Sequence, residues 1–302
     1  MKILVTGGTS TVGKHLQKII PSAKFIGSSD CDLVSYNDTF DYLSNYSPDI
    51  VIHLAAKVGG IKANIDNPVM FYEDNILMNT NILKASYKTG CTRFIGLLST
   101  CAYPDTVNTY PMTERDFHTG PPAPSNFGYG YSKRALATQI DIYNKQYKTN
   151  YQYLIPSNLY SEYDTKPEGS SHYINALIHK IIDAEKQGNK CITLWGDGTP
   201  LRQCTYANDI ARVIDQIIEK NIYSSFNVSF PTNFSIDAIA KMALYTLGKN
   251  DWEINYINPH MNGQYRKDVS IEKMLEYLPD FNFIALEEGI KIIYNKIINN
   301  NE

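Results

Sequence analysis

The chain of 302 residues contains 28 Lys and Arg against 31 Asp and Glu, a formal net charge of −3, with 43% hydrophobic and 20% charged residues. This composition supplies enough apolar material for a core and so excludes wholesale disorder, and the near balance of charge excludes a nucleic-acid binder that works by bulk positive charge. The sequence has no run of 18 apolar residues, so we expect no membrane span, and its five scattered cysteines form no CxxC pair, so we expect no metal site and a reducing, cytoplasmic location.

Short apolar runs alternate with helical stretches through the first half of the chain, and the first of them is too short for a secretion signal. The apolar runs predict strands at Lys2–Thr6, Lys24–Ile26, Asp49–Leu54, Arg93–Leu98 and Tyr151–Ile155. The stretches between them predict helices at Val12–Ile20, Asp38–Asn45, Asn67–Thr89 and Tyr129–Tyr147. Because strands with little polar alternation, separated by helices, form parallel sheets covered on both faces, this order predicts an α/β fold with a Rossmann-type doubly wound sheet.

The pattern changes near residue 160, where the polar segment Ser161–Ser171 interrupts the alternation. The remaining predicted elements are mostly helices, with one short strand and one turn-rich segment: His172–Gln187, Cys191–Trp195, Gly196–Pro200, Ala207–Lys220, Ser235–Leu247 and Leu286–Ile298. We therefore expect a dinucleotide-binding domain over residues 1–160. A smaller mixed domain, mainly for substrate binding, should cover residues 161–302, with some of its segments returning to the sheet.

A glycine loop follows the first predicted strand and opens the first helix. Its residues are Gly7, Gly8, Thr9, Ser10, Thr11, Val12 and Gly13. Glycines at such a turn let backbone N–H groups approach a pyrophosphate at the helix N-terminus, so the placement predicts a dinucleotide site. Ser10 stands where the spacing G-x-x-G-x-x-G has its middle glycine. Its Cβ is expected near the cofactor, which requires the loop to shift slightly or to bind less closely.

The residues after the second strand bear on the choice between NAD and NADP, because an acidic side chain there binds the ribose hydroxyls of NAD. Here the strand is followed by Gly27, Ser28 and Ser29 before Asp30. The small side chains leave room for a 2′-phosphate, so we predict NADP(H), with Ser28 and Ser29 beside the ribose. Asp30 is the residue that would favour NAD.

Tyr129 and Lys133 are four residues apart at the start of the predicted helix Tyr129–Tyr147, so they lie on one face of it. An ammonium beside a phenol is expected to lower the tyrosine pKa from about 10, and the phenol can donate a proton to a carbonyl oxygen as a hydride arrives. Ser99 ends the fourth predicted strand, at the edge where open α/β sheets bind ligands. Ser99, Tyr129 and Lys133 together predict a carbonyl reductase.

These residues resemble the extended short-chain dehydrogenase/reductases, and among them the GDP-4-keto-6-deoxymannose 3,5-epimerase/4-reductases. The resemblance runs through nearly the whole chain. The segments that carry it are HLAAKVGGI (His53–Ile61), LSTCAYP (Leu98–Pro104), GPP (Gly120–Pro122), NFGYGYSKR (Asn126–Arg134), PSNLY (Pro156–Tyr160), SSH (Ser170–His172), LWGDGTPLRQ (Leu194–Gln203) and NGQYRK (Asn262–Lys267).

The resemblance implies a role for each matching position. Ser99, Tyr129 and Lys133 would reduce the keto group, while Cys101 as base and His172 as acid would move protons at sugar carbons 3 and 5. Besides the glycine loop, Ser28, Ser29, Tyr129 and Lys133, the implied cofactor contacts are Leu54, Ala55, Ala56, Leu97, Leu98, Pro156, Asn158, Leu159 and His172. The implied GDP-sugar contacts are Ser99, Cys101, Asn158, Lys180, Trp195, Arg202, Asn262 and Lys267.

Plainer interpretations stay open for some of these positions. Cys101 could be a small packing residue, as free cysteines often are. Trp195 could belong to the core. We expect His53 and His118 to be structural.

The chain departs from the family in the segment that leads to His172. Enzymes of this type read Asn-Leu-Tyr-Gly-Pro-His-Asp-Asn-Phe, whereas this chain reads Asn158-Leu159-Tyr160-Ser161-Glu162-Tyr163-Asp164-Thr165-Lys166. The replacements add charge and bulk beside the expected sugar site. A related GDP-4-keto sugar such as a heptose, or reduction without epimerisation, is therefore an open alternative.

The function that the resemblance implies is NADPH-dependent reduction of carbon 4 of a GDP-4-keto-6-deoxy sugar, with epimerisation at carbons 3 and 5. The alternatives are a reductase without epimerase activity on a related GDP-4-keto sugar, a galactose-epimerase-like isomerase that holds NAD, and a dinucleotide-sensing protein. The long helices Asn67–Thr89 and Tyr129–Tyr147 resemble those that form a four-helix interface in this family, so a homodimer is expected.

Overall fold

The computed structural model describes residues 1–164, 172–258 and 264–299. Within these residues, six parallel strands form the central sheet in the spatial order β10–β5–β4–β3–β1–β2. The strands are β1 (Ile3–Thr6), β2 (Lys24–Ile26), β3 (Ile50–His53), β4 (Arg93–Leu97), β5 (Asn150–Pro156) and β10 (Phe226–Val228). The doubly wound parallel sheet predicted from the sequence is confirmed.

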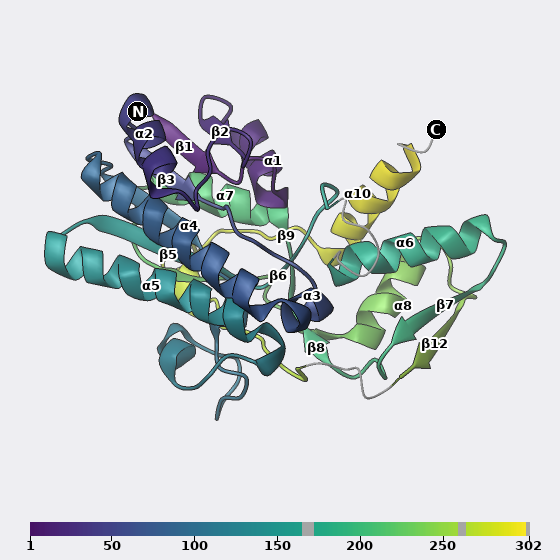
Figure 1. Cartoon of the computed structure of the whole chain (residues 1–302). Coiled ribbons are helices and arrows are strands. Elements are labelled where there is room, and N and C mark those ends of the chain that lie inside the picture. The colour runs from purple at the N-terminus through teal and green to yellow at the C-terminus, as the bar shows by residue number, and fades with distance from the viewer. Residues whose placement is uncertain (165–171, 259–263, 300–302) are drawn as a thin grey trace.

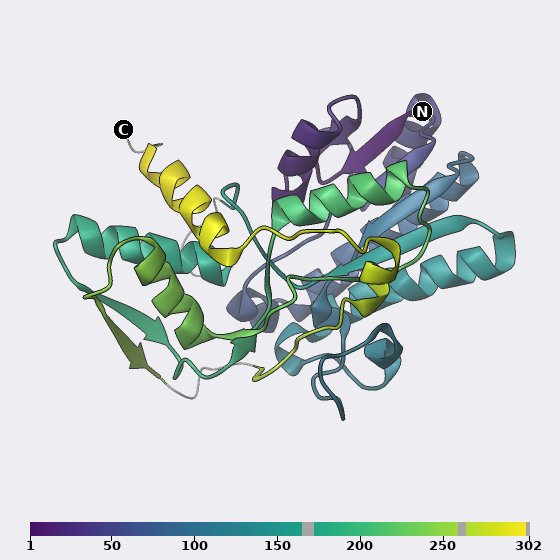
Figure 2. The ribbon, with the colours of Figure 1, turned by 180° about the vertical axis from the view of Figure 1, so that it is seen from behind.

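Helices cover both faces of this sheet (Figures 1 and 2). One face carries α1 (Thr11–Ile19) and α7 (Ala207–Glu219), and the other carries α2 (Tyr36–Tyr46), α4 (Pro68–Lys88) and α5 (Phe127–Tyr147). Because successive strand residues point to opposite faces, Val5 and Ile52 pack in the core under α7, whereas Leu4 and Val51 pack under α4 and α5. Burial on both faces explains why these strands are continuously apolar.

The strand order reverses between β1 and β3, which are neighbours in the sheet although β2 lies between them in the sequence. In open α/β sheets, ligands bind outside the carboxyl ends of the strands at such a switch point. The glycine loop follows β1 at this edge, and the segments after β3, β4 and β5 end beside it. The fold therefore assembles the predicted site residues from four separate strands at one edge.

We call the central sheet and its covering helices the sheet lobe. A second lobe lies beside it (Figure 1). It packs α6 (Tyr173–Lys186), α8 (Ile236–Thr246) and α10 (Leu286–Asn299) around one apolar cluster. Its small sheets pair β7 (Cys191–Trp195) with β12 (Glu253–Ile257) in parallel and β8 (Leu201–Arg202) with β11 (Phe234–Ser235) antiparallel. A parallel pair of β6 (Asn158–Tyr160) and β9 (Cys204–Tyr206) lies between the lobes.

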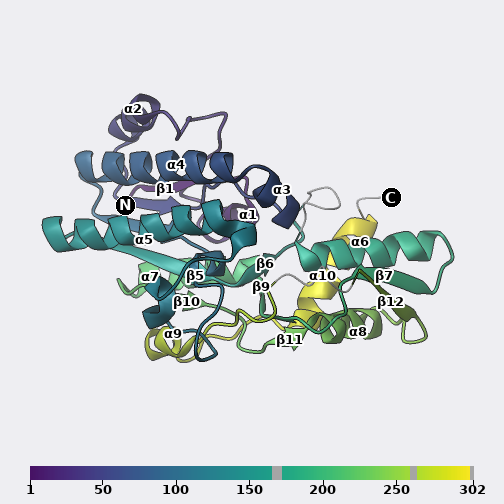
Figure 3. The ribbon, with the colours of Figure 1, turned by 60° about the horizontal axis from the view of Figure 1, so that its bottom comes forward.

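Residues from the second half also complete the sheet lobe, as Figure 3 shows for α7, β10 and α9 (Glu272–Tyr277). Ile210 and Ile214 of α7, Phe226 of β10 and Met274 of α9 share one buried cluster with β1 and β3. The remaining short helices are α3 (Ile61–Asp66), η1 (Thr100–Ala102), η2 (Glu114–His118) and η3 (Pro124–Asn126). Among the described residues, no helix has the length and apolar character needed to span a membrane.

Candidate active site

The glycine loop is a tight turn that leaves no space for side chains at its first and last glycine. Gly7 has a φ of +70°, and a Cβ there would lie 2.7 Å from the backbone N of Ala55. A Cβ at Gly13 would lie 2.5 Å from the carbonyl oxygen of Gly7. The turn thus presses β1 against the segment after β3 and brings the start of α1 close to the edge of the sheet. This close approach of backbone fits a dinucleotide pyrophosphate.

Ser10, which replaces the middle glycine, has a local structural role. It is the N-cap of α1, and its Oγ accepts a hydrogen bond from the backbone N–H of Gly13 at 3.1 Å. Such a cap satisfies one of the backbone donors that a helix leaves unpaired at its N-terminus. The helix accordingly begins at Thr11, one residue before the predicted start. The serine therefore stabilises the loop conformation that its neighbouring glycines permit.

The turn after β2 holds Asp30 in a backbone contact. Its Oδ2 accepts a hydrogen bond from the N–H of Gly27 at 2.8 Å. Ser28 and Ser29 are exposed in this turn, and the position of a Cβ on Gly27 would lie 3.8 Å from Thr9 of the glycine loop. The carboxylate is directed back into its own turn, while two small hydroxyl side chains face outward. This arrangement suits a ribose that carries a 2′-phosphate.

Three segments follow the carboxyl ends of β3, β4 and β5 at the same edge. After β3, the Leu54 N–H donates to the carbonyl of Thr6 at 3.2 Å, and Ala55 and Ala56 follow. After β4, the Leu98 N–H donates to the carbonyl of Leu154 at 2.8 Å. The residues concerned are all predicted cofactor contacts: Leu54, Ala55, Ala56, Leu97, Leu98, Pro156, Asn158 and Leu159.

Ser99, Tyr129 and Lys133 come together where α5 crosses the end of β4. The Ser99 hydroxyl lies near enough to the phenol of Tyr129 to influence its pKa, and it accepts the N–H of Cys101 at 3.1 Å. Lys133 is only 2% exposed, its Nζ lies 5.8 Å from the centre of the Tyr129 ring, and it donates to the carbonyl of Leu97 at 2.8 Å. The geometry places a proton donor, a hydroxyl partner and a buried cation side by side.

The pKa of Tyr129 moves in the direction opposite to the one predicted from the sequence. Burial, the largest cause, raises it, a negative charge on Cys101 would raise it further, and only the hydrogen bond from Ser99 opposes them. Burial lowers the pKa of Lys133 to about 8. The prediction failed because it weighed the lysine charge and neglected desolvation of the phenol. The consequence is that Tyr129 keeps its proton at neutral pH, as a proton donor must.

The close approach of α5 to η1 depends on two residues that the sequence analysis did not assign to the site. A Cβ on Gly130 would lie 2.5 Å from the carbonyl oxygen of Cys101, so only glycine fits there. Arg134 donates from Nε to the carbonyl of Ala102 at 3.0 Å and from Nη1 to that of Gly120 at 2.8 Å. A glycine inside a predicted helix was the available signal, because it usually marks close backbone contact.

Cys101 lies half-buried at the start of the loop after β4, with a cation against its sulfur. The Nζ of Lys267 lies 3.6 Å from Sγ, and the charge of Arg202 also acts on this thiol. Lys267 comes from a segment 166 residues further along the chain, so the contact is built by the fold. A thiolate formed at Cys101 would be stabilised by these two positive charges. A packing role for Cys101 would not require a lysine ammonium in contact with its sulfur.

His172 is the N-cap residue of α6, and Asp164 holds its backbone. Its backbone N–H donates to Oδ2 of Asp164 at 3.1 Å, and the residue is exposed. Ser170 and Ser171, which precede it in the family motif, lie outside the described residues. The structure thus fixes the backbone of His172 at the border between the two lobes, at the entry to α6.

Three of the predicted GDP-sugar contacts, Lys180, Trp195 and Arg202, lie on the second lobe. Lys180 of α6 donates from Nζ to the carbonyl of Thr193 at 3.1 Å, and Arg202 of β8 donates to the carbonyls of Leu201 and Tyr265 at 2.7 and 3.4 Å. Asn158 donates to the carbonyl of Gln203 at 3.1 Å. Trp195 ends β7 and is 63% exposed, so the alternative that it belongs to the core is wrong. Asn262 lies outside the described residues.

His53 has the structural role that was expected. It is fully buried between Thr6, whose hydroxyl lies 2.8 Å from Nδ1, and Asn79, whose Oδ1 lies 3.0 Å from Nε2. Burial lowers the pKa of His53 to about 3, so the ring is neutral. Asn79 in turn donates to the carbonyl of Ser132, next to Lys133, at 3.2 Å.

His118 is exposed and packs edge-on against Phe117. Within the described residues, no group of three or more acidic, histidine or cysteine side chains could hold a metal ion.

Comparison with known proteins places these features in context. A family model described as "NAD dependent epimerase/dehydratase family" matches residues 3–229. A probable GDP-L-fucose synthase of Drosophila melanogaster is 34% identical, over 96% of this chain and 94% of that protein. A GDP-L-colitose synthase of Yersinia pseudotuberculosis is also 34% identical, over 96% of each chain. The crystal structure of a GDP-L-fucose synthetase from Naegleria fowleri bound to NADP superimposes with a TM-score of 0.88 and 32% identity, over 99% of this chain and 93% of that one.

Proposed function

Because this chain belongs to the NAD dependent epimerase/dehydratase family, we propose that it carries out the reaction of its GDP-L-fucose synthase relatives. It is an NADP-dependent oxidoreductase that reduces carbon 4 of a GDP-4-keto-6-deoxy sugar and epimerises carbons 3 and 5. The observation that carries the proposal is that the residues expected to reduce carbon 4 lie next to the cysteine expected to remove a proton from the sugar. Ser99, Tyr129 and Lys133 adjoin Cys101, which faces Lys267.

The residues around the glycine loop fit NADP(H). Gly7 and Gly13 allow the backbone approach that a pyrophosphate needs, and Ser28 and Ser29 face outward while Asp30 is held by Gly27. When bound, NADPH supplies the hydride for carbon 4. Tyr129 donates the proton to the oxygen on carbon 4, and Ser99 hydrogen-bonds the same oxygen. Lys133, fixed on the carbonyl of Leu97, holds a positive charge behind the phenol.

Epimerisation needs a base and an acid at carbons 3 and 5, whose hydrogens the 4-keto group acidifies. We assign the base to Cys101, whose thiolate Lys267 and Arg202 would stabilise, and the acid to His172 at the entry to α6. Lys180, Arg202 and Lys267 would neutralise the diphosphate, with Trp195 exposed for stacking, and Asn158 and Asn262 would complete the contacts. Arg202 in particular offers a planar fork that suits phosphate oxygens.

A second candidate is a carbon-4 reductase that no longer epimerises and acts on a related GDP-4-keto sugar such as a GDP-heptose. The replacements at Ser161, Glu162 and Tyr163 favour it, because they adjoin Asp164, which accepts the backbone N–H of His172. A relative named for colitose matches as well as one named for fucose, so identity at this level spans more than one sugar. The two candidates share the reductase residues and differ in whether Cys101 and His172 act.

Reduction in heavy water with unlabelled NADPH separates the two candidates. A base that removes the hydrogens at carbons 3 and 5 exchanges them with solvent, whereas the hydride at carbon 4 comes from the cofactor. With GDP-4-keto-6-deoxymannose as substrate, we expect deuterium at carbons 3 and 5 and none at carbon 4, read by NMR of the product. The heptose analogue, run in parallel, measures the preference between the two sugars.

The matched variant is Cys101→Ala. It should lose the solvent label, because the thiolate is gone, and should still reduce carbon 4, because Ser99, Tyr129 and Lys133 are untouched. A reduced product without label from the wild-type enzyme would establish the reductase-only candidate. Failure to reduce either sugar with NADPH would reject the proposed function itself.

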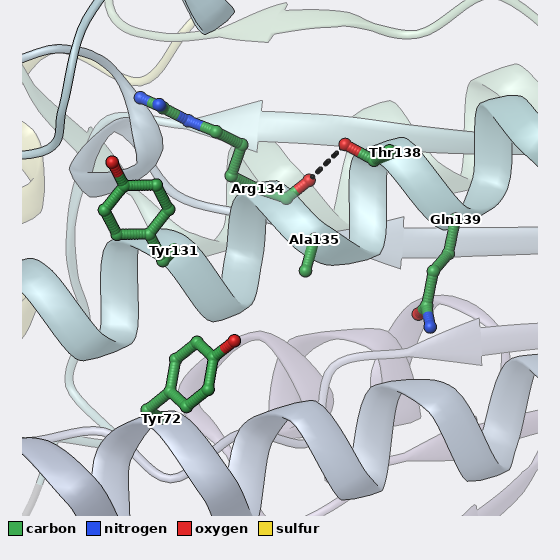
Figure 4. Close-up of a pocket in the computed structure, with 6 residues that line it drawn as sticks. All are labelled: Tyr72, Tyr131, Arg134, Ala135, Thr138 and Gln139. Carbon is green, nitrogen blue, oxygen red and sulfur yellow. Dashed lines mark hydrogen bonds between the residues drawn. The ribbon is translucent and has the colours of Figure 1, made fainter.

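We also propose that the enzyme is a homodimer joined through α4 and α5. These two helices lie side by side on the outside of the sheet lobe (Figures 1 and 3). The apolar side chains they expose are Val69, Met70, Tyr72, Leu77, Phe127, Ile142 and Tyr147. A hollow opens between the helices, and its lining side chains, shown in Figure 4, are Tyr72, Tyr131, Arg134, Ala135, Thr138 and Gln139. A twofold pair would cover this surface.

The cytoplasm is the location we propose for this enzyme. All five cysteines are free thiols. Free thiols persist in a reducing compartment.

For the domains, we propose that residues 1–160 bind the cofactor and that residues 161–302 mainly bind the sugar nucleotide. Within the second range, α7 and β10 belong to the sheet lobe.

A further inference from the structure

A buried polar cluster joins the cofactor helix to the segment in which this chain departs from its family. Its centre is His15 of α1, two residues after the last glycine of the loop and 1% exposed. His15 Nε2 lies 3.0 Å from Oγ of Ser161 and 3.5 Å from Oε2 of Glu162. On its other side, Nδ1 lies 3.2 Å from Nδ2 of Asn208, at the start of α7. The imidazole therefore bridges the sheet lobe and the altered segment.

Ser161 is in turn hydrogen-bonded to the first turn of α6. Its backbone is held at both ends by Asn175, which donates from Nδ2 to the Ser161 carbonyl at 2.8 Å and accepts the Ser161 N–H at 3.4 Å. The Asp164 N–H donates to the same Ser161 carbonyl at 3.1 Å, and Asp164 accepts the N–H of His172 at 3.1 Å. Ser161, Asp164 and Asn175 are all buried, so these bonds do not compete with solvent. A short path of hydrogen bonds thus runs from His15 to His172.

Glu162 and Tyr163 reinforce the same attachment. Burial opposes the ionisation of Glu162, but hydrogen bonds from His15 and Tyr206 outweigh it and lower the pKa of Glu162 to about 2. Tyr163 packs edge-on against His15, with ring centres 4.9 Å apart. Lys14 and Lys18 of α1 lie over the outer face of Tyr163, at 5.4 and 5.2 Å from the ring centre. The charge and bulk that the segment gained are therefore used in contacts with α1.

We propose that His15 is a positioning residue for the epimerisation step, which holds His172 in register with the glycine-loop helix through Ser161 and Asp164. The inference rests on the proposed function and deepens it. The replacement at 162 removes a proline that restricts the backbone of the same segment in the family, and His15 supplies a constraint from another element. The altered segment is then re-anchored, and epimerisation is retained. Removal of His15 should release His172 while leaving Ser99, Tyr129 and Lys133 in place.

The test compares His15→Ala and His15→Gln with the wild-type enzyme by two readouts. The first is the ratio of solvent deuterium at carbons 3 and 5 to hydride transferred to carbon 4, with GDP-4-keto-6-deoxymannose and NADPH. The second is amide hydrogen exchange of peptides that cover residues 161–176. The affinity for NADPH, measured by titration, checks that the glycine loop is intact.

For His15→Ala we expect the label ratio to fall about 10- to 100-fold, because a displacement of about 1 Å at a catalytic group can cost that much. Exchange in residues 161–176 should accelerate, while carbon-4 reduction changes far less. His15→Gln retains a donor that can reach Ser161 and should restore most of the label ratio. A merely structural role would not separate the two steps or show this rescue.

Glu162→Gln and Glu185→Gln form a matched pair of controls. Each carboxylate accepts a tyrosine hydroxyl and lies beside a basic side chain. The partners are Tyr206 and His15 for Glu162, and Tyr294 and Lys249 for Glu185. Only Glu162→Gln should lower the label ratio, because Glu185 lies at the far end of α6. An equal effect of both variants would overturn the proposal.

Two further outcomes decide the remaining cases. Unchanged exchange over residues 161–176 in His15→Ala would overturn the proposal whatever the activity. If the wild-type product carries no solvent label, the epimerase part of the proposed function fails, and the exchange experiment alone decides on His15. Faster exchange in His15→Ala would then support the role of His15 in positioning His172, and unchanged exchange would reject that role.

Discussion

Tyr129 and Lys133 show how burial sets the charge of neighbouring side chains in opposite ways. Desolvation disfavours the charged form of each, so it raises the pKa of the phenol and lowers the pKa of the ammonium. Near neutral pH the tyrosine is therefore a neutral acid beside a lysine that is still charged. This combination suits proton donation to a keto oxygen.

Substitution of Tyr129 by phenylalanine tests the donor. Tyr129→Phe removes the proton donor and preserves the shape of the pocket, so the rate of carbon-4 reduction should fall by about 10²–10⁴-fold. NADPH should bind as in the wild type, because Lys133 and the glycine loop remain, and fluorescence titration measures this. Turnover close to that of the wild type would remove Tyr129 from the mechanism.

The pH dependence of the reductase should report Lys133. Its ammonium is present below its pKa of about 8 and is lost as the pH rises through that value, while Tyr129 stays protonated because its pKa is raised. We therefore expect kcat/KM for NADPH to decline about tenfold per pH unit above about pH 8, since this parameter reports the free enzyme. Circular dichroism at each pH shows whether the enzyme remains folded. A constant kcat/KM up to about pH 10 would contradict this account.

The sequence predicted that four side chains of the candidate site would lie close together, and their roles remain predictions. The structure brings Ser99, Cys101, Tyr129 and Lys133 together, as their positions at a strand end and on one helix face implied. Distant partners were not predictable by the same reasoning. The contacts of Lys267 with Cys101 and of His15 with Ser161 join residues 166 and 146 positions apart, and only the fold creates them.

At the scale of elements, the close crossing of α5 over η1 fixes the distance between the reductase residues and Cys101. Gly130→Ala would place a methyl group 2.5 Å from the carbonyl oxygen of Cys101, which is a backbone atom that cannot turn aside. We expect α5 to shift and carbon-4 reduction to fall about 10²-fold, because Tyr129 moves with the helix.

Gly120→Ala is the matched control for that substitution. Its new methyl would lie 3.3 Å from the Cβ of Pro104, a tight contact with a side chain rather than with backbone. Its effect on the rate should be much smaller, as steady-state kinetics on both variants would measure. Equal losses in the two variants would show that the distance between α5 and η1 does not limit the reaction.

Prediction of elements from the sequence succeeded for the long helices and for most strands of the central sheet, whereas the five-residue strand β12 was missed. The long helices α4, α5, α6 and α10 start and end within two residues of the predicted bounds, because their apolar faces repeat over several turns. The pairs β8–β11 and β6–β9 were not predicted, since their two- and three-residue strands contain no period to detect. Strand β2, which also has three residues, was predicted from its place in the alternation of strands and helices. Strand β10, which also has three residues, completes the sheet from the second half of the chain, and its partner β5 could not be inferred locally.

At the scale of the whole molecule, the exposed apolar surface of α4 and α5 predicts association. The wild-type enzyme should have a mass near twice the 34.2 kDa of one chain in light scattering at about micromolar concentration. Leu77→Glu combined with Ile142→Glu places charge on this surface and should yield monomers. Tyr245→Glu, at a 75% exposed residue of α8, is the control and should leave the dimer intact. A monomeric wild-type enzyme would refute the proposed interface.

The course of the chain between the lobes has a consequence for how such enzymes acquire new sugars. Residues 207–228 leave the second lobe to form α7 and β10, and α7 covers Val5 and Ile52 of the sheet. A fragment that ends at residue 160 would lack this cover and should be insoluble. Recombination at that boundary cannot transfer specificity as a separate module. A change of specificity is then expected within loops at the border of the lobes, and a loop such as 161–164, which packs on α1, would have to change together with that helix.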